Sequence, residues 1–377
     1  MKKQIILKQD NKYQQLFKCF RNNEINNILI VCGKHCQKLI VFQNIKELCE
    51  EDNISMYIFD EFQANPKYEA VCNGVKLFRE NNCKAIIAIG GGSAMDVAKC
   101  IKMFCYMDET EHFFKQKILS NEVLLAAIPT TAGTGAESTR FAVIYYEGEK
   151  LSVSDDCGLP DVVILETSSL KELSEYQRKV TALDALAHGI ESYWSANSTE
   201  ESRNLSKDTI SGFFLFYKGY LLNQEKENRE MLLVANMAGR AINITQTTAA
   251  HAMSYKISSM YDIAHGHAVG ICLPIVLKYM ISHMNKCCDI RGKDFLESTF
   301  REIAYAAGCN DIECTANKLE QLIVKELQLE IPKLNNYTEL EQLYQSVNYE
   351  RLKNNPIRLE VSDLIEIYQD IFNEKRG

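Results

Sequence analysis

Apolar runs and helical patterns alternate through residues 1–167 of this chain. Five mostly apolar runs stand at residues 28–32, 55–59, 85–89, 124–128 and 159–165. Between two of them, residues 68–81 have apolar positions at helical spacing. Apolar strands without polar alternation, separated by helices, are typical of a parallel sheet that is covered on both faces. The pattern therefore predicts an α/β domain built on a parallel sheet.

From residue 171 onward the pattern becomes helical and continues so to the end of the chain. We therefore expect an all-α helical bundle as a second domain, which a length of 377 residues favours. The predicted boundary lies at Thr167, giving domains 1–167 and 168–377. The tail, 335–377, is charged and amphipathic, and we expect solvated helix faces there.

A triple glycine follows the third apolar run, in the sequence GGGSAMDVAK at residues 90–99. Glycines at the end of a strand let backbone amides approach a pyrophosphate, and the next helix directs its positive N-terminus at it. The segment lacks the GxGxxG spacing of the dinucleotide fingerprint. A triple glycine alone is equally compatible with a simple turn.

Residues 184–191, DALAHGIE, have the spacing of a ligand pair on a helix. Asp184 and His188 are four residues apart, and Glu191 follows three residues later, so all three side chains project from one helix face. This arrangement offers a platform for two metal ligands.

A second histidine cluster includes His251 and His265. An unbroken helix would separate them by about 21 Å at about 1.5 Å per residue. They can share an ion only if the helix that begins near His251 ends around residues 260–263. One carboxylate and three imidazoles would suit iron or zinc better than magnesium or calcium. The alternative is that these are ordinary histidines on helix faces.

The two clusters, with CLP soon after the second, resemble the iron-containing (group III) alcohol dehydrogenases over residues 29–278. The resemblance implies a Rossmann-like, dehydroquinate-synthase-like α/β domain followed by a helical domain. It implies Fe(II), or alternatively zinc, held by Asp184, His188, His251 and His265.

The same resemblance implies NADPH or NADH as the cofactor. Its motifs GGGSxxDxxK and PTTAGTGxE, an Asn-Pro turn and a lysine imply contacts from Asn65, Gly91, Gly92, Ser93, Asp96, Thr130, Thr131, Thr134 and Lys150. Many members that use NAD have an aspartate after the first strand, where this chain has Gly33 and then Lys34. NADPH is therefore plausible, and neither nicotinamide is excluded.

A dinucleotide in the first domain and a metal in the second would leave the substrate in the cleft between them. The metal would polarise a carbonyl oxygen while the nicotinamide supplies hydride. We therefore expect an oxidoreductase that reduces an aldehyde to a primary alcohol, or runs in reverse.

Residues 242–274 look most like the phosphonoacetaldehyde reductase branch, which makes 2-hydroxyethylphosphonate. Tyr255 stands where many members have a further histidine that helps to relay a proton, and His267 is a candidate replacement, or else a packing histidine. Lys256, near the metal, and Arg140 are candidate cations for the phosphonate, or else surface side chains.

Three other functions remain open. A reductase of small neutral aldehydes, of the propanediol or butanol type, is the nearest. A dehydroquinate-synthase-like or glycerol-phosphate enzyme shares the general fold, and net NADPH consumption would separate it. A non-catalytic metal-stabilised module would not bind a nicotinamide.

The net charge of −8 argues against a nucleic-acid partner. The start, residues 1–7, has no apolar stretch of signal-peptide length, and no run is long enough to span a bilayer. We therefore expect a cytoplasmic enzyme without a membrane partner, acting on a small molecule. The family resemblance implies a homodimer or a higher homo-oligomer.

Overall fold

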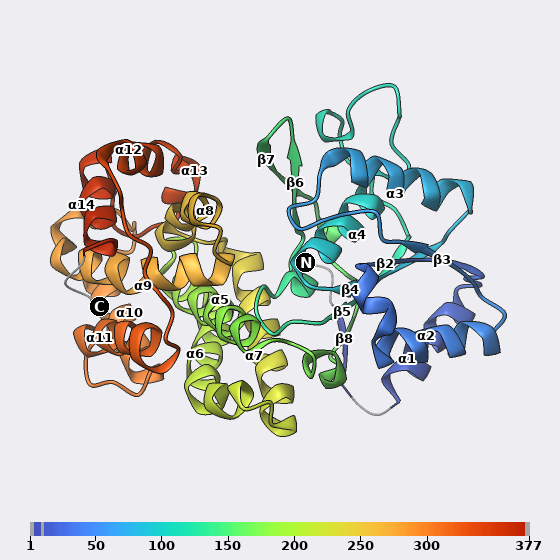
Figure 1. Cartoon of the computed structure of the whole chain (residues 1–377), viewed down its shortest axis with the longest axis horizontal. Helices are drawn as coiled ribbons and strands as arrows, with labels where there is room; N and C mark the ends of the chain where they lie inside the picture. Colours follow the sequence, from blue (N-terminus) through green and yellow to red (C-terminus); the bar gives the residue numbers. More distant parts are fainter. Residues whose placement is uncertain (1–3, 9–10, 374–377) are drawn as a thin grey trace. The chain divides into compact units, whose positions relative to one another are not determined.

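A computed structural model describes residues 4–8 and 11–373, which fall into two compact units, 1–173 and 174–377 (Figure 1). Residues 1–3 belong to the start of the chain, where no signal peptide is predicted, and residues 374–377 belong to the predicted tail. Both segments lie outside the described residues. The strands are β1 (Ile5–Leu7), β2 (Asn27–Cys32), β3 (Ser55–Phe59), β4 (Ala85–Gly90), β5 (Leu124–Pro129), β6 (Phe141–Tyr146), β7 (Glu149–Ser154) and β8 (Val162–Ile164). The helices are α1 (Lys12–Asn22), α2 (Ile40–Glu51), α3 (Tyr68–Glu80), α4 (Gly92–Phe104), α5 (Glu175–Trp194), α6 (Glu200–Leu221), α7 (Glu225–Thr245), α8 (Ala249–Tyr261), α9 (His265–Ser282), α10 (Lys293–Ala306), α11 (Ile312–Gln321), α12 (Tyr337–Gln345), α13 (Tyr349–Leu352) and α14 (Val361–Ile371).

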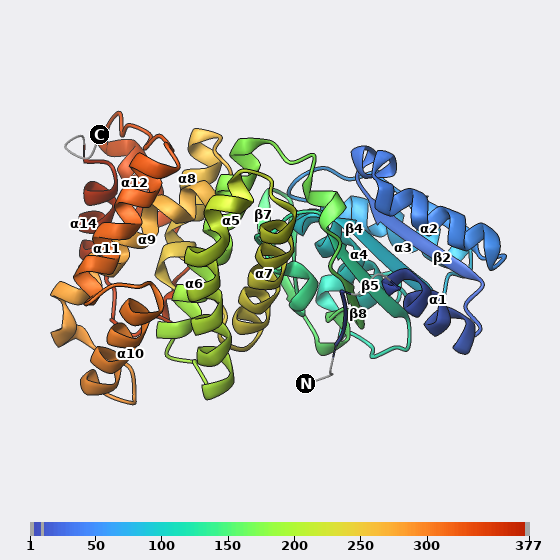
Figure 2. The ribbon, with the colours of Figure 1, turned by 90° about the horizontal axis from the view of Figure 1, so that it is seen from below.

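The first unit contains a six-stranded sheet in the order β1-β8-β5-β4-β2-β3, with every neighbouring pair parallel (Figure 2). The predicted parallel sheet is confirmed, and each of the five apolar runs overlaps one of its strands. Strand β1 was not predicted, because three residues are too few to show a periodicity. The antiparallel hairpin β6–β7 was also missed.

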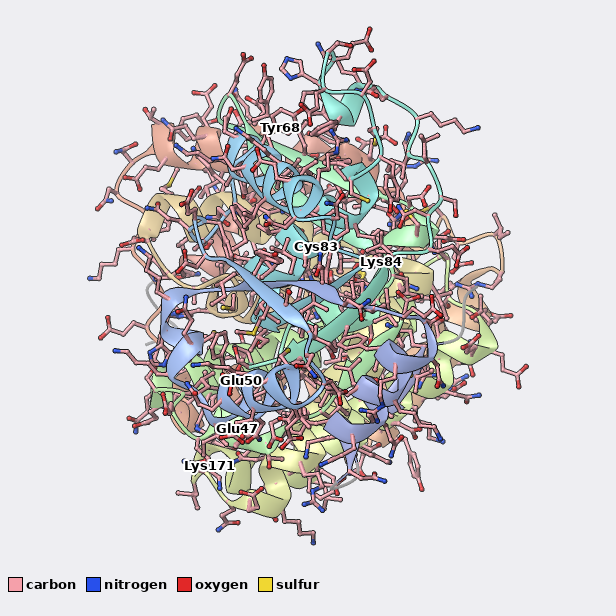
Figure 3. The ribbon with its side chains drawn as sticks, turned by 90° about the vertical axis from the view of Figure 1, so that its right-hand side faces the viewer. Glu47, Glu50, Tyr68, Cys83, Lys84 and Lys171 are labelled. Atoms are coloured by element: carbon pink, nitrogen blue, oxygen red, sulfur yellow. The ribbon has the colours of Figure 1, made fainter. Side chains whose placement is uncertain are left out.

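Helices cover both faces of this sheet, as the absence of polar alternation requires. Alternate residues of β2 enter two different cores: Ile28 and Ile30 pack with α1 and α2, whereas Leu29 and Val31 pack with α3 and α4. Helix α2 buries one face and leaves Glu47 and Glu50 exposed, as the labelled side chains in Figure 3 illustrate.

The direction in which successive strands are added to the sheet reverses after β3. The chain passes from β2 to β3 on one side and then crosses to β4 on the other side. In open parallel sheets, ligands bind outside the carboxyl ends of the strands at such a switch point. Gly33 follows β2 and Gly91 follows β4, so both turns lie at this edge of the sheet.

The second unit has helices and no strand within its described residues, as predicted. Helix α5 is its centre, since every residue from Ala182 to Trp194 is buried and α6, α7 and α9 pack around it. The expectation of a solvated tail is only partly right, because α12 and α14 bury Leu340, Leu343 and Leu364 against α8 and α9. None of the helices described is long and apolar enough to cross a membrane.

The units divide between Leu173 and Ser174, whereas the sequence analysis placed the boundary at Thr167. The intervening residues form a 3-10 helix, Thr167–Leu170, that packs against α2. Ser169 Oγ also donates to the carbonyl oxygen of Pro129 at the end of β5 (3.1 Å). These contacts keep the segment with the sheet.

Candidate functional site

Helix α5 carries the first cluster of the second unit. The helix begins with a capping box in which Ser174 and Gln177 satisfy each other's backbone amides. Asp184, His188 and Glu191 follow on one face and are all buried, with at most 5% of each residue exposed. The three side chains that the spacing predicts on one face are therefore all inside the second unit.

The chain reverses between α8 and α9, as shared ligation of one ion would require. Helix α8 ends at Tyr261, and Asp262 takes a left-handed conformation with φ 50° and ψ 42°. This stop lies inside the predicted window of residues 260–263. His251 lies in the first turn of α8 and His265 begins α9, and their rings are 5.4 Å apart, centroid to centroid.

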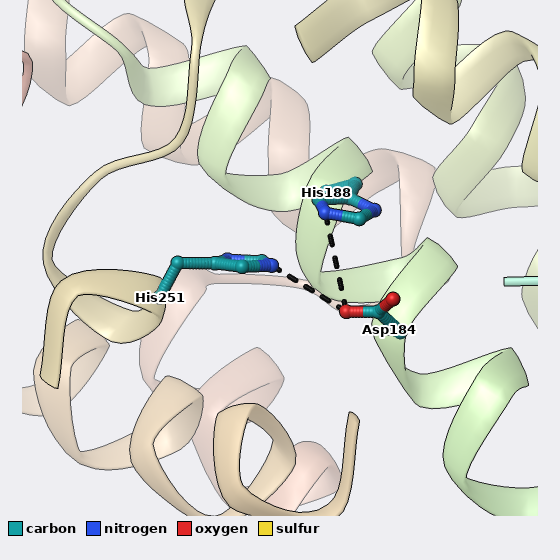
Figure 4. Close-up of side chains that lie close together, drawn as sticks. All are labelled: Asp184, His188 and His251. Carbon is teal, nitrogen blue, oxygen red and sulfur yellow. Dashed lines mark ion pairs between the residues drawn. The ribbon is translucent and has the colours of Figure 1, made fainter. Parts of the chain in front are cut away.

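Three histidines surround one carboxylate oxygen. The Nε2 atoms of His251, His188 and His265 lie 3.4, 3.9 and 4.0 Å from Asp184 Oδ1. Figure 4 shows Asp184 with His188 and His251, whose rings stack 4.5 Å apart. Asp184, His188 and His251 each offer a ligand atom within 4.8 Å of the others. All four predicted ligands are thus brought together.

Glu191 orients His251, a role that the sequence analysis did not assign. One oxygen of Glu191 contacts His251 Nδ1. The other accepts from Thr248 Oγ1 (2.7 Å) and from the backbone amide of Ala250 (2.9 Å), so it also caps α8. A carboxylate on one ring nitrogen leaves the second nitrogen available as a metal ligand. In the sequence, the only indication of this role was the position of Glu191, three residues after His188.

The charges of this cluster depend on one another. Burial raises the pKa of Asp184, but the neighbouring histidines lower it further, so it lies well below its usual range. Burial lowers the pKa of His251, but Glu191 and Asp184 outweigh this effect and raise it to about 9.

The cluster fits a divalent ion. Asp184 Oδ1 and His251 Nε2 are buried, and neither has a well-formed hydrogen bond within the described residues. Buried polar atoms are almost always satisfied, so two buried polar atoms that face each other without a well-formed hydrogen bond indicate a missing partner. A carboxylate with imidazoles suits a first-row transition ion.

His267 does not join this cluster through its ring nitrogens. Its Nε2 donates to the carbonyl oxygen of Glu330 (2.9 Å), so Nδ1 accepts from Tyr176 Oη (3.1 Å). Tyr176 Oη in turn accepts from the amide of Ala264, just before His265 (3.1 Å). The packing alternative therefore describes His267 better than the predicted proton transfer, because both nitrogens are already engaged.

The other predicted substrate and relay residues have different surroundings. The ring of Tyr255 stacks on that of His265 at 5.2 Å and 4°. Lys256 is half-buried on α8. Arg140, in the first unit, lies with Nε 3.7 Å from Asp156 Oδ1 and stacks over Phe141.

The glycine and threonine segments meet in the first unit. Gly90 and Pro129 are paired in register at the carboxyl ends of β4 and β5. A methyl group on Gly91 would lie 3.6 Å from Thr131, and one on Gly92 would lie 3.5 Å from Thr134. Because larger side chains would fill this space, the glycines keep a backbone-lined cradle open at the N-terminus of α4. Ser93 is in its first turn, and Thr130 donates its amide to the carbonyl oxygen of Gly90 (3.0 Å).

The remaining predicted cofactor residues gather near this cradle. Burial raises the pKa of Asp96 to about 6, and nearby Lys99 and Lys150 oppose the shift. Lys150 is the strand partner of Tyr145, whose amide donates to the carbonyl oxygen of Pro66 (2.9 Å). Asn65, which precedes Pro66, is exposed, with φ 57°. These residues therefore lie in one region of the first unit.

Proteins with a similar sequence are named as alcohol or aldehyde-alcohol dehydrogenases. The chain is 27% identical over 307 residues to alcohol dehydrogenase 4 of Schizosaccharomyces pombe, covering 79% of this chain and 70% of that protein. It is 30% identical over 327 residues to aldehyde-alcohol dehydrogenase 2 of Entamoeba histolytica, covering 80% of this chain but only 37% of that longer protein.

Solved structures share the fold over the whole length. An iron-containing alcohol dehydrogenase from Thermococcus thioreducens superposes with a TM-score of 0.89 at 20% identity, covering 99% of both chains. A sulfoacetaldehyde reductase from Bifidobacterium kashiwanohense, in complex with NAD+, gives 0.86 at 21% identity, covering 99% of this chain and 98% of that one. At these identities the likeness establishes the fold.

Family models cover both units. The model described as iron-containing alcohol dehydrogenase matches residues 4–167, and that of the C-terminal part of the same family matches residues 179–372. The second match alone spans more than half of the chain and includes the whole carboxylate and histidine cluster. The chain therefore belongs to the iron-containing alcohol dehydrogenase family of oxidoreductases.

Proposed function

We propose that this protein is an NAD(P)H-dependent, metal-dependent reductase of a small aldehyde that carries an anionic group. Our preferred reaction converts phosphonoacetaldehyde to 2-hydroxyethylphosphonate. The observation that carries the metal dependence is the buried cluster around Asp184 Oδ1, in which this oxygen and His251 Nε2 face each other without a well-formed hydrogen bond in the described part of the chain.

Asp184, His188, His251 and His265 are the proposed metal ligands, and Fe(II) is the proposed ion, with zinc as the alternative. A divalent ion in this position supplies Lewis acidity to a carbonyl or alcohol oxygen. The chain fixes the ligands before an ion binds: Glu191 orients His251, and stacking against Tyr255 orients His265.

The cradle at Gly91, Gly92 and Ser93 is the proposed site for the pyrophosphate of NADPH or NADH. The bound dinucleotide supplies the hydride. Backbone amides at the N-terminus of α4 would hold the phosphates. Asp96, Thr130, Thr131 and Thr134 are the proposed neighbours of the rest of the cofactor, with Asn65 and Lys150 beside them. Lys34, exposed after β2, is compatible with a 2′-phosphate.

The anionic substrate is supported by the resemblance of residues 242–274 to phosphonoacetaldehyde reductases and by the shared fold with a reductase of sulfoacetaldehyde. Both substrates are two-carbon aldehydes with a charged oxyanion group, which requires a cation for recognition. Of the two predicted cations, Arg140 already has Asp156 as a partner. Lys256 makes no ion pair within the described residues.

The decisive experiment compares phosphonoacetaldehyde with propionaldehyde, using iron-reconstituted protein and following NADPH and NADH oxidation by absorbance. We expect a large preference in kcat/KM for the phosphonate. Asp184→Asn should lose bound metal and activity toward both aldehydes, because an amide oxygen cannot replace the charge of the carboxylate among three imidazoles. Retention of stoichiometric metal by Asp184→Asn would contradict the proposed ligand set.

A reductase of small neutral aldehydes is the second candidate, since relatives that match most of this chain are named alcohol dehydrogenases. Equal or better turnover of propionaldehyde would favour it. A dehydroquinate-synthase-like activity would be favoured instead if neither aldehyde caused net NADPH consumption.

A further inference from the structure

We propose that Arg351 is the cation that recognises the anionic group of the substrate. This inference rests on the proposed function and deepens it. The ligand class is an aldehyde with a phosphonate, sulfonate or carboxylate group close to the carbonyl carbon. The tail that carries Arg351 shows no motif in the sequence that predicts chemistry there.

A stack of three planar groups connects Arg351 to the cluster. The guanidinium carbon of Arg351 lies 5.2 Å from the ring centroid of Tyr255. The ring of Tyr255 in turn stacks on that of His265, whose Nε2 is 4.0 Å from Asp184 Oδ1. A positive charge thereby lies against the ring of Tyr255, which also stacks on the proposed metal ligand His265.

Thr247 fixes the direction of the guanidinium. The Nη1 atom of Arg351 donates to Thr247 Oγ1 (3.0 Å), and Thr247 is buried with 6% of its surface exposed. Gln246, just before it, has φ 59°, a conformation that non-glycine residues rarely adopt and that clusters at functional sites. The link between α7 and α8 therefore presents a buried hydroxyl to Arg351.

The backbone of the tail is anchored to the same link. Asn354 Nδ2 donates to the carbonyl oxygen of Thr247 (3.2 Å), and Asn354 Oδ1 accepts from Asn197 Nδ2 (2.7 Å). The carbonyl oxygen of Asn354 also accepts from the amide of Ala196, just after α5 (2.9 Å). These hydrogen bonds hold the backbone near Arg351 in place against the α7–α8 link and the end of α5.

The charge of Arg351 is not neutralised. Arg203 pairs with Glu302 and Arg291 with Asp289, but Arg351 makes no ion pair with any described carboxylate. Its guanidinium has five donors, of which Thr247 occupies one, so a fork remains for a tetrahedral oxyanion. Arg351 is partly buried, stacks on Tyr255 and has no carboxylate partner among the described residues. Such an arginine is suited to bind an anionic ligand.

Lys256 is the competing cation. It directly follows Tyr255 on α8, so it projects about 100° around the helix from that ring. Arg351 instead lies over the ring itself. The geometry therefore favours Arg351 for an anion that is held beside Tyr255 and His265.

The test compares Arg351→Met and Arg351→Lys with Lys353→Met, which removes an exposed cation from the same segment. We expect Arg351→Met to lower kcat/KM for phosphonoacetaldehyde about 10- to 100-fold, mainly through KM, as for a lost charge-assisted bond of roughly 1.5–3 kcal/mol. The kcat/KM for propionaldehyde should change by less than about threefold. Arg351→Lys should recover part of the loss, and Lys353→Met should behave as the wild type. Sulfoacetaldehyde and succinic semialdehyde, run in parallel, identify the oxyanion.

Calorimetric titration with ethylphosphonate gives a second readout that needs no turnover. The wild type should bind this anion, and Arg351→Met should not. Equal losses toward phosphonoacetaldehyde and propionaldehyde, or unchanged ethylphosphonate binding in Arg351→Met, would overturn the role of Arg351. If the wild type reduces neither aldehyde, the proposed function fails, while the titration still decides whether Arg351 binds an anion.

Discussion

At the scale of single residues, Glu191 decides which nitrogen of His251 faces Asp184. Its carboxylate contacts Nδ1, so Nε2 is directed at Asp184 Oδ1, 3.4 Å away. Carboxylates behind ligand histidines fix the tautomer and the orientation of the ring. We therefore expect the metal affinity of the proposed site to depend on a residue that need not touch the ion.

Glu191→Gln should weaken metal binding about 10- to 100-fold, the usual effect of removing such a partner. An amide oxygen can still accept from Thr248, so α8 should keep its cap. Chelator competition measures the affinity. Glu302→Gln, which removes a carboxylate paired with Arg203 in the same unit, is the matched control and should bind metal normally. An unchanged affinity in Glu191→Gln would show that the contact with His251 does not support ligation.

The metal-free protein should have a pH-dependent stability that originates at His251. Its pKa of about 9 exceeds the ordinary value of 6.5, so the protonated ring stabilises the fold fully below about pH 6.5. This stabilisation is lost as the pH rises through about 9, with a slope of at most about 1.4 kcal/mol per pH unit. Urea unfolding of chelator-treated protein between about pH 6 and pH 10 measures it. His251→Gln should have a shallower profile, and identical slopes in both proteins would assign the effect to other groups.

At the scale of elements, the cluster depends on the close approach of α9 to α5. Gly266, beside His265, permits it, because a Cβ atom there would lie 2.0 Å from the carbonyl oxygen of Val180 and 3.0 Å from Asp184 Cβ. A backbone atom cannot move away without displacing the whole helix. Glycine therefore permits the short distance between the two helices that carry Asp184 and His265.

Gly266→Ala should destabilise the protein by about 1–3 kcal/mol, the usual range for overpacking, and should also weaken metal binding. Gly270→Ala is the comparison on the same helix, since its Cβ would meet only the end of the Leu183 side chain, at 2.8 Å. Its effect should be smaller, because that side chain can move. Denaturation and metal titration test both variants, and equal effects would mean that the backbone contact at Val180 is not limiting.

At the scale of the whole molecule, the two candidate sites belong to different compact units. The carboxylate and histidine cluster lies in residues 174–377, and the glycine cradle lies in residues 1–173. A ligand that binds only the folded state stabilises it by about 2.7 kcal/mol at a hundredfold excess over its Kd. Each ligand should therefore protect mainly its own unit.

Hydrogen exchange measured by mass spectrometry should resolve the two effects. Metal should slow exchange in peptides of α5, α8 and α9, and NADPH should slow it around β4, α4 and the loop after β5. Asp184→Asn should lose only the protection by metal. Protection of the β4–α4 peptides by metal alone would contradict the proposed division of sites.

The sequence by itself determined most strands of the sheet, the helical second unit and the residues of the proposed metal site. Its apolar runs predicted the parallel sheet, because strands buried on both faces contain few polar residues. The spacing of Asp184 and His188 fixed a common helix face, since side-chain direction on a helix is set by periodicity. A metal site shared by His251 and His265 would require a break in the helix, and α8 ends just before Asp262.

Only the tertiary structure decided the partners that come from distant parts of the chain. In the fold, β1 pairs with β8 and Glu191 contacts His251. His267 bonds with Tyr176 and Glu330, and Arg351 lies over the ring of Tyr255. Periodicity fixes where a side chain points around its own helix or strand. It carries no information about which other element packs there, because that choice depends on how all the buried surfaces fit together.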